Sequence, residues 1–137
     1  MGTCVLDCSV TMSWAFKEEF SPFTQGLLSA LPEAQAIVPP VWPLEVASVL
    51  LIAERGGRMP QVDSLRFMDL LESLPISVEA LLERRLLDDV LPLARETGLT
   101  VYDASYLELA GRIGLPLATL DTKLQHAAQR VGVRLLS

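Results

Sequence analysis

The sequence predicts an α/β protein, a three-layer α/β/α sandwich built on a short parallel sheet of about five strands. Short apolar runs alternate with longer segments of helical pattern along the chain. Such an alternation is typical of a parallel sheet that helices cover on both faces. The chain has 137 residues, of which 50% are hydrophobic and 20% charged. Because this is the length and composition of one folded unit, we expect a single domain over residues 1–137.

The first half of the chain opens with an apolar run that we interpret as a buried strand ending at Asp7. Proline and glycine mark the ends of the helices that follow. Pro22 stands at the start of one helix, and Gly56 and Gly57 end another. The elements predicted in this half are strands over residues 3–6 and 36–38 and helices over 9–16, 22–31, 41–55 and 60–73.

In the second half, glycines again mark the helix ends. Gly98, Gly114 and Gly132 each follow a segment of helical pattern, and glycine is common just past a helix end. The elements predicted here are helices over residues 80–97, 100–113 and 122–131 and strands over 76–78, 116–120 and 133–136. The helix over 41–55 is apolar nearly all round, which predicts that it is buried on every side.

Several classes of protein and site do not fit the sequence. Its longest internal apolar run is far shorter than the ~20 residues that span a bilayer, and no basic region of a signal peptide precedes the first strand. We therefore expect a cytoplasmic protein. Cys4 and Cys8 are the only cysteines and His126 is the only histidine, whereas a zinc site needs more such ligands. We expect both cysteines to be small buried residues without a disulfide.

The net charge of −6 speaks against a general nucleic-acid binder, which usually carries a basic face. Bound divalent cations would offset part of this charge locally. The mean hydropathy of +0.37 is high for a small domain, and it predicts a surface apolar enough to need a partner.

Four acidic residues occupy positions where a sheet of this kind collects ligands. Asp7 follows the first predicted strand and Asp121 the fourth, so both belong to the carboxyl edge of the sheet. Glu45 lies within the apolar helix over 41–55, where a carboxylate is costly unless it is paired or bound to metal. Asp103 lies at the start of the helix over 100–113.

Each of these acids also has a purely structural interpretation. Asp7 and Asp121 fit helix N-caps. Glu45 could favour the dipole of its helix from the first turn, and Asp103 fits a capping-box spacing with Thr100. Four carboxylates at one edge would raise one another's pKa values. Mg²⁺ or Mn²⁺ would resolve that conflict and could activate water for attack on phosphorus.

Four stretches of sequence surround these acids: VLDCS at 5–9, PLEVA at 43–47, LTVYDASYLELA at 99–110 and LATLDTKL at 117–124. The third is the most specific. Together they resemble the PIN domain family, and more narrowly the VapC-type toxin ribonucleases of type II toxin–antitoxin systems. The order of elements agrees over nearly the whole chain, whereas residues 57–98 match only in outline.

The resemblance implies a Mg²⁺/Mn²⁺-dependent endoribonuclease that acts on RNA, is usually homodimeric and is held inactive by a cognate antitoxin. The acidic quartet of the family maps onto Asp7, Glu45, Asp103 and Asp121. We assign Asp7 and Asp103 as metal ligands, directly or through water. Glu45 and Asp121 would complete the cage or polarise the attacking water. A catalytically silent PIN-fold protein-interaction module is the alternative, although the presence of all four acids favours an enzyme.

Other residues have supporting roles under the same resemblance. Ser9 and Thr119 match hydroxyl positions beside the first and last acids, where they would orient carboxylates or waters. Lys123 stands where some relatives carry a further acid, so we expect one tightly held ion in the absence of RNA. Lys17, Arg55 and Lys123 are candidates for contacts with RNA phosphates, although long basic side chains on helices are more often solvated.

Overall fold

The computed structural model describes residues 3–137, and its core is a parallel sheet. Its strands are β1 (Cys4–Leu6), β2 (Ala36–Val38), β3 (Ile76–Val78) and β4 (Leu117–Ala118). They lie in the order β3-β2-β1-β4, and every pair is parallel. The chain adds β2 and β3 on one side of β1 and then returns to place β4 on the other side. The order of strands therefore reverses at β1, where α/β sheets open a crevice for ligands.

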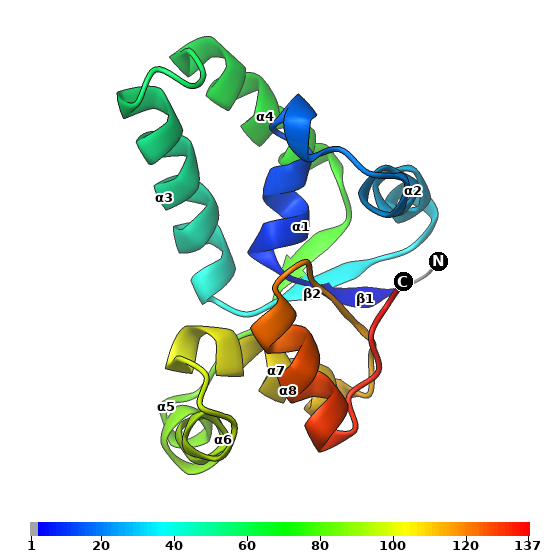
Figure 1. Cartoon of the computed structure of the whole chain (residues 1–137), viewed down its shortest axis with the longest axis vertical. Coiled ribbons are helices and arrows are strands. Elements are labelled where there is room, and N and C mark those ends of the chain that lie inside the picture. Colours follow the sequence, from blue (N-terminus) through cyan, green and yellow to red (C-terminus); the bar gives the residue numbers. More distant parts are fainter. Residues whose placement is uncertain (1–2) are drawn as a thin grey trace.

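Helices cover both faces of the sheet (Figure 1). On one side lie α1 (Cys8–Ser13), α2 (Pro22–Ala30), α3 (Val41–Arg55) and α4 (Gln61–Ser73). On the other side lie α5 (Glu83–Arg85), α6 (Leu91–Thr97), α7 (Val101–Ile113) and α8 (Thr122–Val131). Two 3₁₀ turns, η1 (Lys17–Glu19) and η2 (Leu31–Glu33), and a π-helical turn, η3 (Leu86–Val90), join them. The predicted α/β architecture with helices on both faces is confirmed.

The centre of the core is β1, whose three side chains are fully buried. Cys4 and Cys8 are both buried and neither forms a disulfide, as predicted. Burial raises the pKa of the Cys4 thiol to about 11, so this thiol stays neutral at physiological pH. No helix within residues 3–137 is both long enough and apolar enough to cross a bilayer.

The sheet has four strands, not about five, and its last strand is short. The predicted strand over 133–136 is reduced to one bridge between Leu117 and Leu135, and β4 has two residues in place of the predicted five. The reason lies in the loop after β4. The Leu120 N–H donates to the Ser9 hydroxyl instead of to a neighbouring strand, so the ladder stops at Ala118.

The helix predicted over 80–97 begins only at Glu83 and widens into η3 before α6. Pro92 explains the wide turn. Proline has no N–H, so it cannot bond to the carbonyl four residues earlier, and its ring crowds that carbonyl. The helix is wider just before Pro92, where the Leu91 N–H bonds to Leu86 O in a π turn. The helix predicted over 9–16 also ends early, at Ser13, whose hydroxyl donates to a carbonyl of its own helix.

The prediction that the helix over 41–55 is buried on every side is wrong. In α3, Trp42, Val46 and Leu50 face the core, whereas Leu44 is 72% exposed and Ile52 is 66% exposed. The cause is its position, because α3 and α4 form a hairpin that extends away from the sheet (Figure 1). Only one stripe of α3 therefore packs against other residues of the part described, 3–137, and its outer apolar stripe is exposed.

Candidate active site

Asp7 lies at the carboxyl end of β1 and is only 5% exposed. Its Oδ2 atom accepts hydrogen bonds from the Ser9 hydroxyl at 2.6 Å and the Thr119 hydroxyl at 2.8 Å. The Ser9 N–H also donates to Oδ2 at 3.4 Å, so Asp7 caps α1. Burial raises the pKa of Asp7, against the opposing effect of the hydrogen bonds from Ser9 and Thr119.

The two hydroxyls connect Asp7 to the loop between β4 and α8. Ser9 Oγ accepts the Leu120 N–H at 2.9 Å, and Thr119 Oγ1 accepts the Asp121 N–H at 3.1 Å. Each hydroxyl therefore donates to the first acid and accepts from the backbone beside the last one. Ser9 and Thr119 lie where the sequence placed them, next to Asp7 and Asp121.

Asp121 is the N-cap of α8, where its Oδ1 accepts the Lys123 N–H at 2.9 Å and the Leu124 N–H at 3.4 Å. The structural interpretation of Asp7 and Asp121 as caps is therefore correct. Capping a helix does not prevent either residue from binding a metal ion. Each cap uses one carboxylate oxygen, and the other oxygen takes no part in these hydrogen bonds.

Glu45 lies beyond the first turn of α3, so the helix dipole does not account for it. Its Oε1 accepts a hydrogen bond from the Tyr106 hydroxyl at 2.6 Å. Tyr106 is fully buried in α7, and burial together with the hydrogen bond to Glu45 raises its pKa far above its usual range. Tyr106 is therefore a permanent donor that joins α7 to α3.

Asp103 lies in the first turn of α7, where its N–H donates to the Thr100 hydroxyl at 3.1 Å. Burial and then the charges of Asp7 and Asp121 raise the pKa of Asp103. Burial and then the charges of Asp7 and Asp103 raise the pKa of Glu45. These shared effects mean that the four carboxylates are close enough to repel one another.

All four acids line one hollow of about 450 Å³. Its wall brings together β1, α3, α7 and the loop before α8, which are far apart in the sequence. Within residues 3–137, none of these four acids forms a salt bridge with a lysine, arginine or histidine. The hollow therefore contains like charges that form no ion pair with a positive side chain of the described residues.

This donor set fits a hard divalent cation. All four groups offer carboxylate oxygens, the ligand type that Mg²⁺ and Mn²⁺ take. Among the described residues, no three carboxylate, thiol or imidazole groups converge closely enough to ligate one ion together. Mg²⁺ does not require this, because it typically keeps several waters and uses one or two direct carboxylates. The residues fit an ion bound partly through water.

The basic residues proposed from the sequence lie outside the wall of the hollow. Lys17, Arg55 and Lys123 are exposed, and none of them lines it. Burial and the neighbouring acids raise the pKa of Asp103, and the charge of Lys123 offsets a small part of this rise. This electrostatic effect is the one link between the Lys123 side chain and the acids of the hollow found among the described residues. The basic residue that does line the hollow is Arg58, which sequence reasoning missed. The one available signal was its position directly after the glycines that end α3.

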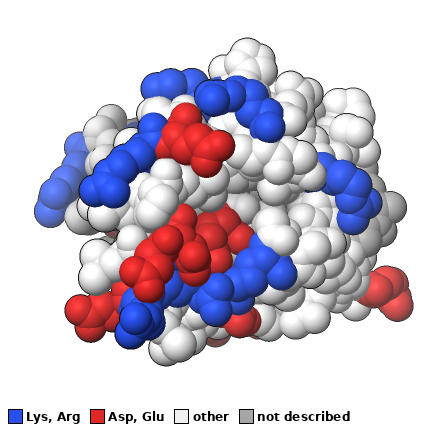
Figure 2. Space-filling view, turned by 90° about the horizontal axis from the view of Figure 1, so that it is seen from below, with Lys and Arg blue, Asp and Glu red and all other residues white. Residues whose placement is uncertain are grey.

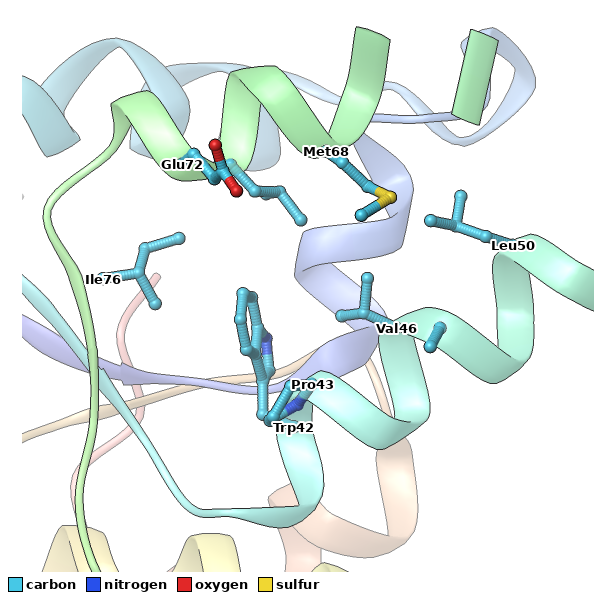
Figure 3. Close-up of a pocket in the computed structure, with 9 residues that line it drawn as sticks. Trp42, Pro43, Val46, Leu50, Met68, Glu72 and Ile76 are labelled. Carbon is cyan, nitrogen blue, oxygen red and sulfur yellow. The ribbon is translucent and has the colours of Figure 1, made fainter. Parts of the chain in front are cut away.

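A second hollow is apolar and lies between α3 and α4. It has a volume of about 330 Å³. Figure 3 shows the Trp42 ring in the groove, with Val46 and Leu50 of α3 facing Met68 of α4. Glu72 is the only charged residue in its lining. The groove adjoins the outer stripe of α3, so this hairpin carries much of the exposed apolar surface.

Comparison with known proteins identifies the family. The model of the PIN domain matches residues 4–130. The chain belongs to the PIN domain family. PIN domains are generally nucleases and commonly use a divalent metal ion, which agrees with the carboxylates around the hollow. This PIN domain is similar to the crystal structure of PAE2754 from Pyrobaculum aerophilum, with 26% sequence identity and a TM-score of 0.68. The similarity covers 93% of this chain and 86% of that one. Among curated proteins, no match was found.

Proposed function

We propose that this PIN domain is a Mg²⁺/Mn²⁺-dependent endoribonuclease and the toxin of a toxin–antitoxin pair. The observation that carries the proposal is the hollow at the carboxyl edge of the sheet. Four carboxylates share it without a salt bridge, and three of them have pKa values raised by burial. A fold does not gather like charges without a counter-charge for stability, so we infer that they serve to bind a cation.

Asp7 and Asp103 would hold the ion directly or through water, and Glu45 and Asp121 would complete the cage or orient the attacking water. A bound divalent ion lowers the pKa of water and stabilises charge on phosphate oxygens. The chain's own residues supply the positioning. Ser9 and Thr119 fix one oxygen of Asp7, and the Tyr106 hydroxyl fixes one oxygen of Glu45.

The apolar hairpin supports the proposal of protein partners. A groove lined by Trp42, Leu50 and Met68 (Figure 3) would accept apolar side chains of an antitoxin, and the exposed stripe with Leu44 and Ile52 would serve a second copy of the chain. Light scattering should then give a dimer for the wild type and a monomer for Ile52→Asp. A monomeric wild type would refute the homodimer.

The activity is tested by incubating cellular RNA with the purified protein in Mn²⁺, with and without chelator, and mapping the cut sites. We expect cleavage only without chelator. The toxin role is tested by expression without an antitoxin, which should arrest growth unless Asp103 is replaced by Ala. Equal arrest by wild type and Asp103→Ala would contradict that role.

The alternative of a catalytically silent interaction module has support in the same hairpin, because the groove would serve a binding protein equally well. The two proposals separate on the RNA experiment. A silent module leaves cellular RNA intact in Mn²⁺ and does not change its melting temperature when Mn²⁺ is added. A nuclease cuts RNA, and its Tm rises with Mn²⁺ because only the folded state assembles the site.

A further inference from the structure

Arg58 occupies a defined position at the rim of the acidic hollow. Helix α3 ends in a Schellman motif, in which the Gly57 N–H bonds to Glu54 O at 3.1 Å and the Arg58 N–H bonds to Ala53 O at 2.8 Å. Gly57 has a φ of +73°, which glycine adopts without strain. This turn directs the chain so that Arg58 reaches back towards the hollow.

Two glutamates bind the guanidinium of Arg58, and an aromatic ring packs against its face. Its Nη2 atom donates to Glu19 at 2.7 Å, its Nε donates to Glu18 at 3.1 Å, and Nη2 also bonds to Glu18. The Phe16 ring lies under it, with 3.5 Å between the guanidinium carbon and the ring centroid. Among residues 3–137, no hydrogen-bond partner of Nη1 is found, so this nitrogen can donate to a ligand.

A positive group is scarce at this site. Five acids line the hollow, namely the four candidate ligands and Glu19, and Arg58 is the only basic residue among its lining residues. Other arginines are already paired with acids on the α5–α7 side, for example Arg85 and Arg112 with Glu108. Figure 2 likewise shows basic side chains in separate groups with acidic ones among them, and no continuous basic surface on the face in view.

The position of Arg58 relative to the acids defines what it could contact. Glu45 and the end of α3 at Arg55 are ten residues apart, which is about 15 Å along a helix at 1.5 Å per residue. Met12, Phe16 and Val49 also line the hollow. An RNA strand whose scissile phosphate lies at the acids would then bring another of its phosphates to Arg58, which lines the same hollow.

We propose that Arg58 binds a phosphate of the RNA strand away from the scissile bond, and thereby sets substrate affinity. The inference rests on the ribonuclease activity proposed above. Arginine pairs with phosphate through charge-assisted hydrogen bonds, and Nη1 is available for one. The pairs with Glu18 and Glu19 have side chains 63% and 38% exposed. Exposed ion pairs contribute little, so a phosphate can displace one carboxylate without unfolding the region.

Kinetics on a labelled RNA that spans a mapped cut site test the proposal. We expect Arg58→Ala to raise KM roughly threefold to tenfold with kcat unchanged, because a contact away from the reacting bond contributes to binding alone. The slope of log KM against log salt concentration should fall by about 0.7, the value for one phosphate contact with a single strand. Arg66→Ala removes the same charge from an exposed position in α4 outside the hollow and should change neither quantity.

Two further variants separate phosphate binding from a structural role. Arg58→Gln keeps donors for Glu18 and Glu19 but loses the charge, so it should raise KM with a Tm close to that of the wild type. Replacing Glu18 and Glu19 together by Gln should lower KM, because it removes negative charge beside the phosphate. A merely structural Arg58 would lower Tm in all these variants and leave the salt slope unchanged.

The outcomes also distinguish this proposal from the one on which it rests. If the wild type cleaves RNA and Arg58→Ala has the KM and salt slope of Arg66→Ala, Arg58 does not bind phosphate and the ribonuclease activity stands. If kcat falls while KM stays constant, Arg58 acts at the reacting bond and the proposal is overturned. If the wild type cuts no RNA in Mn²⁺, both proposals fail.

Discussion

Replacing Asp7 by Asn removes the most deeply buried of the four charges while keeping the shape of the side chain. The amide oxygen of Asn can still accept from the Ser9 and Thr119 hydroxyls, which bond to one carboxylate oxygen at 2.6 and 2.8 Å. The variant therefore separates the charge of Asp7 from its part in the packing. In the metal-free protein this charge is a cost, because burial raises the pKa of Asp7.

The size of the effect follows from opposing contributions. An uncompensated buried charge costs roughly 3–5 kcal/mol, and hydrogen bonds to a charged group return about 1.5–3 kcal/mol. We therefore expect Asp7→Asn to stabilise the metal-free protein by about 1–2 kcal/mol. For a chain of 137 residues, each kcal/mol corresponds to about 3–4 °C in Tm. The predicted rise in Tm is about 3–8 °C at pH 7.

The assay is thermal unfolding followed by circular dichroism in chelator and in millimolar Mn²⁺. In chelator, Asp7→Asn should melt above the wild type. In Mn²⁺ the wild type should gain stability by mass action, and the variant should gain little and cut no RNA. A metal-free variant that melts below the wild type would show that Asp7 stabilises the fold, and the electrostatic reasoning would be wrong. Full cleavage activity in the variant would remove Asp7 from the site.

Three further predictions concern the surroundings of the acids. The Tm of the metal-free wild type should rise as pH falls through the raised pKa values of the folded state towards the unfolded values near 4. The reason is that a raised pKa gives stability that is full below the unfolded value and is lost above the folded one, so a Tm that only falls as the pH is lowered towards 4 would contradict the assignment. Tyr106→Phe should lower kcat several-fold and Tm by about 4–7 °C, since Glu45 loses its donor, and unchanged kinetics would show that this hydrogen bond does not position Glu45. Gly57→Ala should cost about 1–2 kcal/mol because φ is +73° there, which chemical denaturation would measure, and an unchanged midpoint would mean that the turn relaxes.

The identity of the candidate site was accessible from the sequence because its acids are tied to local signals. Asp7 follows a buried strand, and both Asp7 and Asp121 precede helices that they cap. N-caps depend mainly on neighbouring residues. The common edge then follows from the rule that parallel strands end on one side of a sheet. The same local signals predicted the glycine stops of α3, α6, α7 and α8.

Other features depend on contacts between distant residues and only the tertiary structure decided them. The role of Tyr106 needs Glu45, 61 positions away, and the position of Arg58 needs Glu18 and Glu19. The exposure of α3 was mispredicted because its apolar composition shows only which side chains are able to be buried. Which of them are buried depends on how the rest of the chain packs against the helix. The short β4 has the same origin, since the N–H of Leu120, just beyond the strand, bonds to a side chain 111 residues away. Local chemistry therefore determined which residues form the candidate site, and long-range packing determined how they are held and which surfaces remain open.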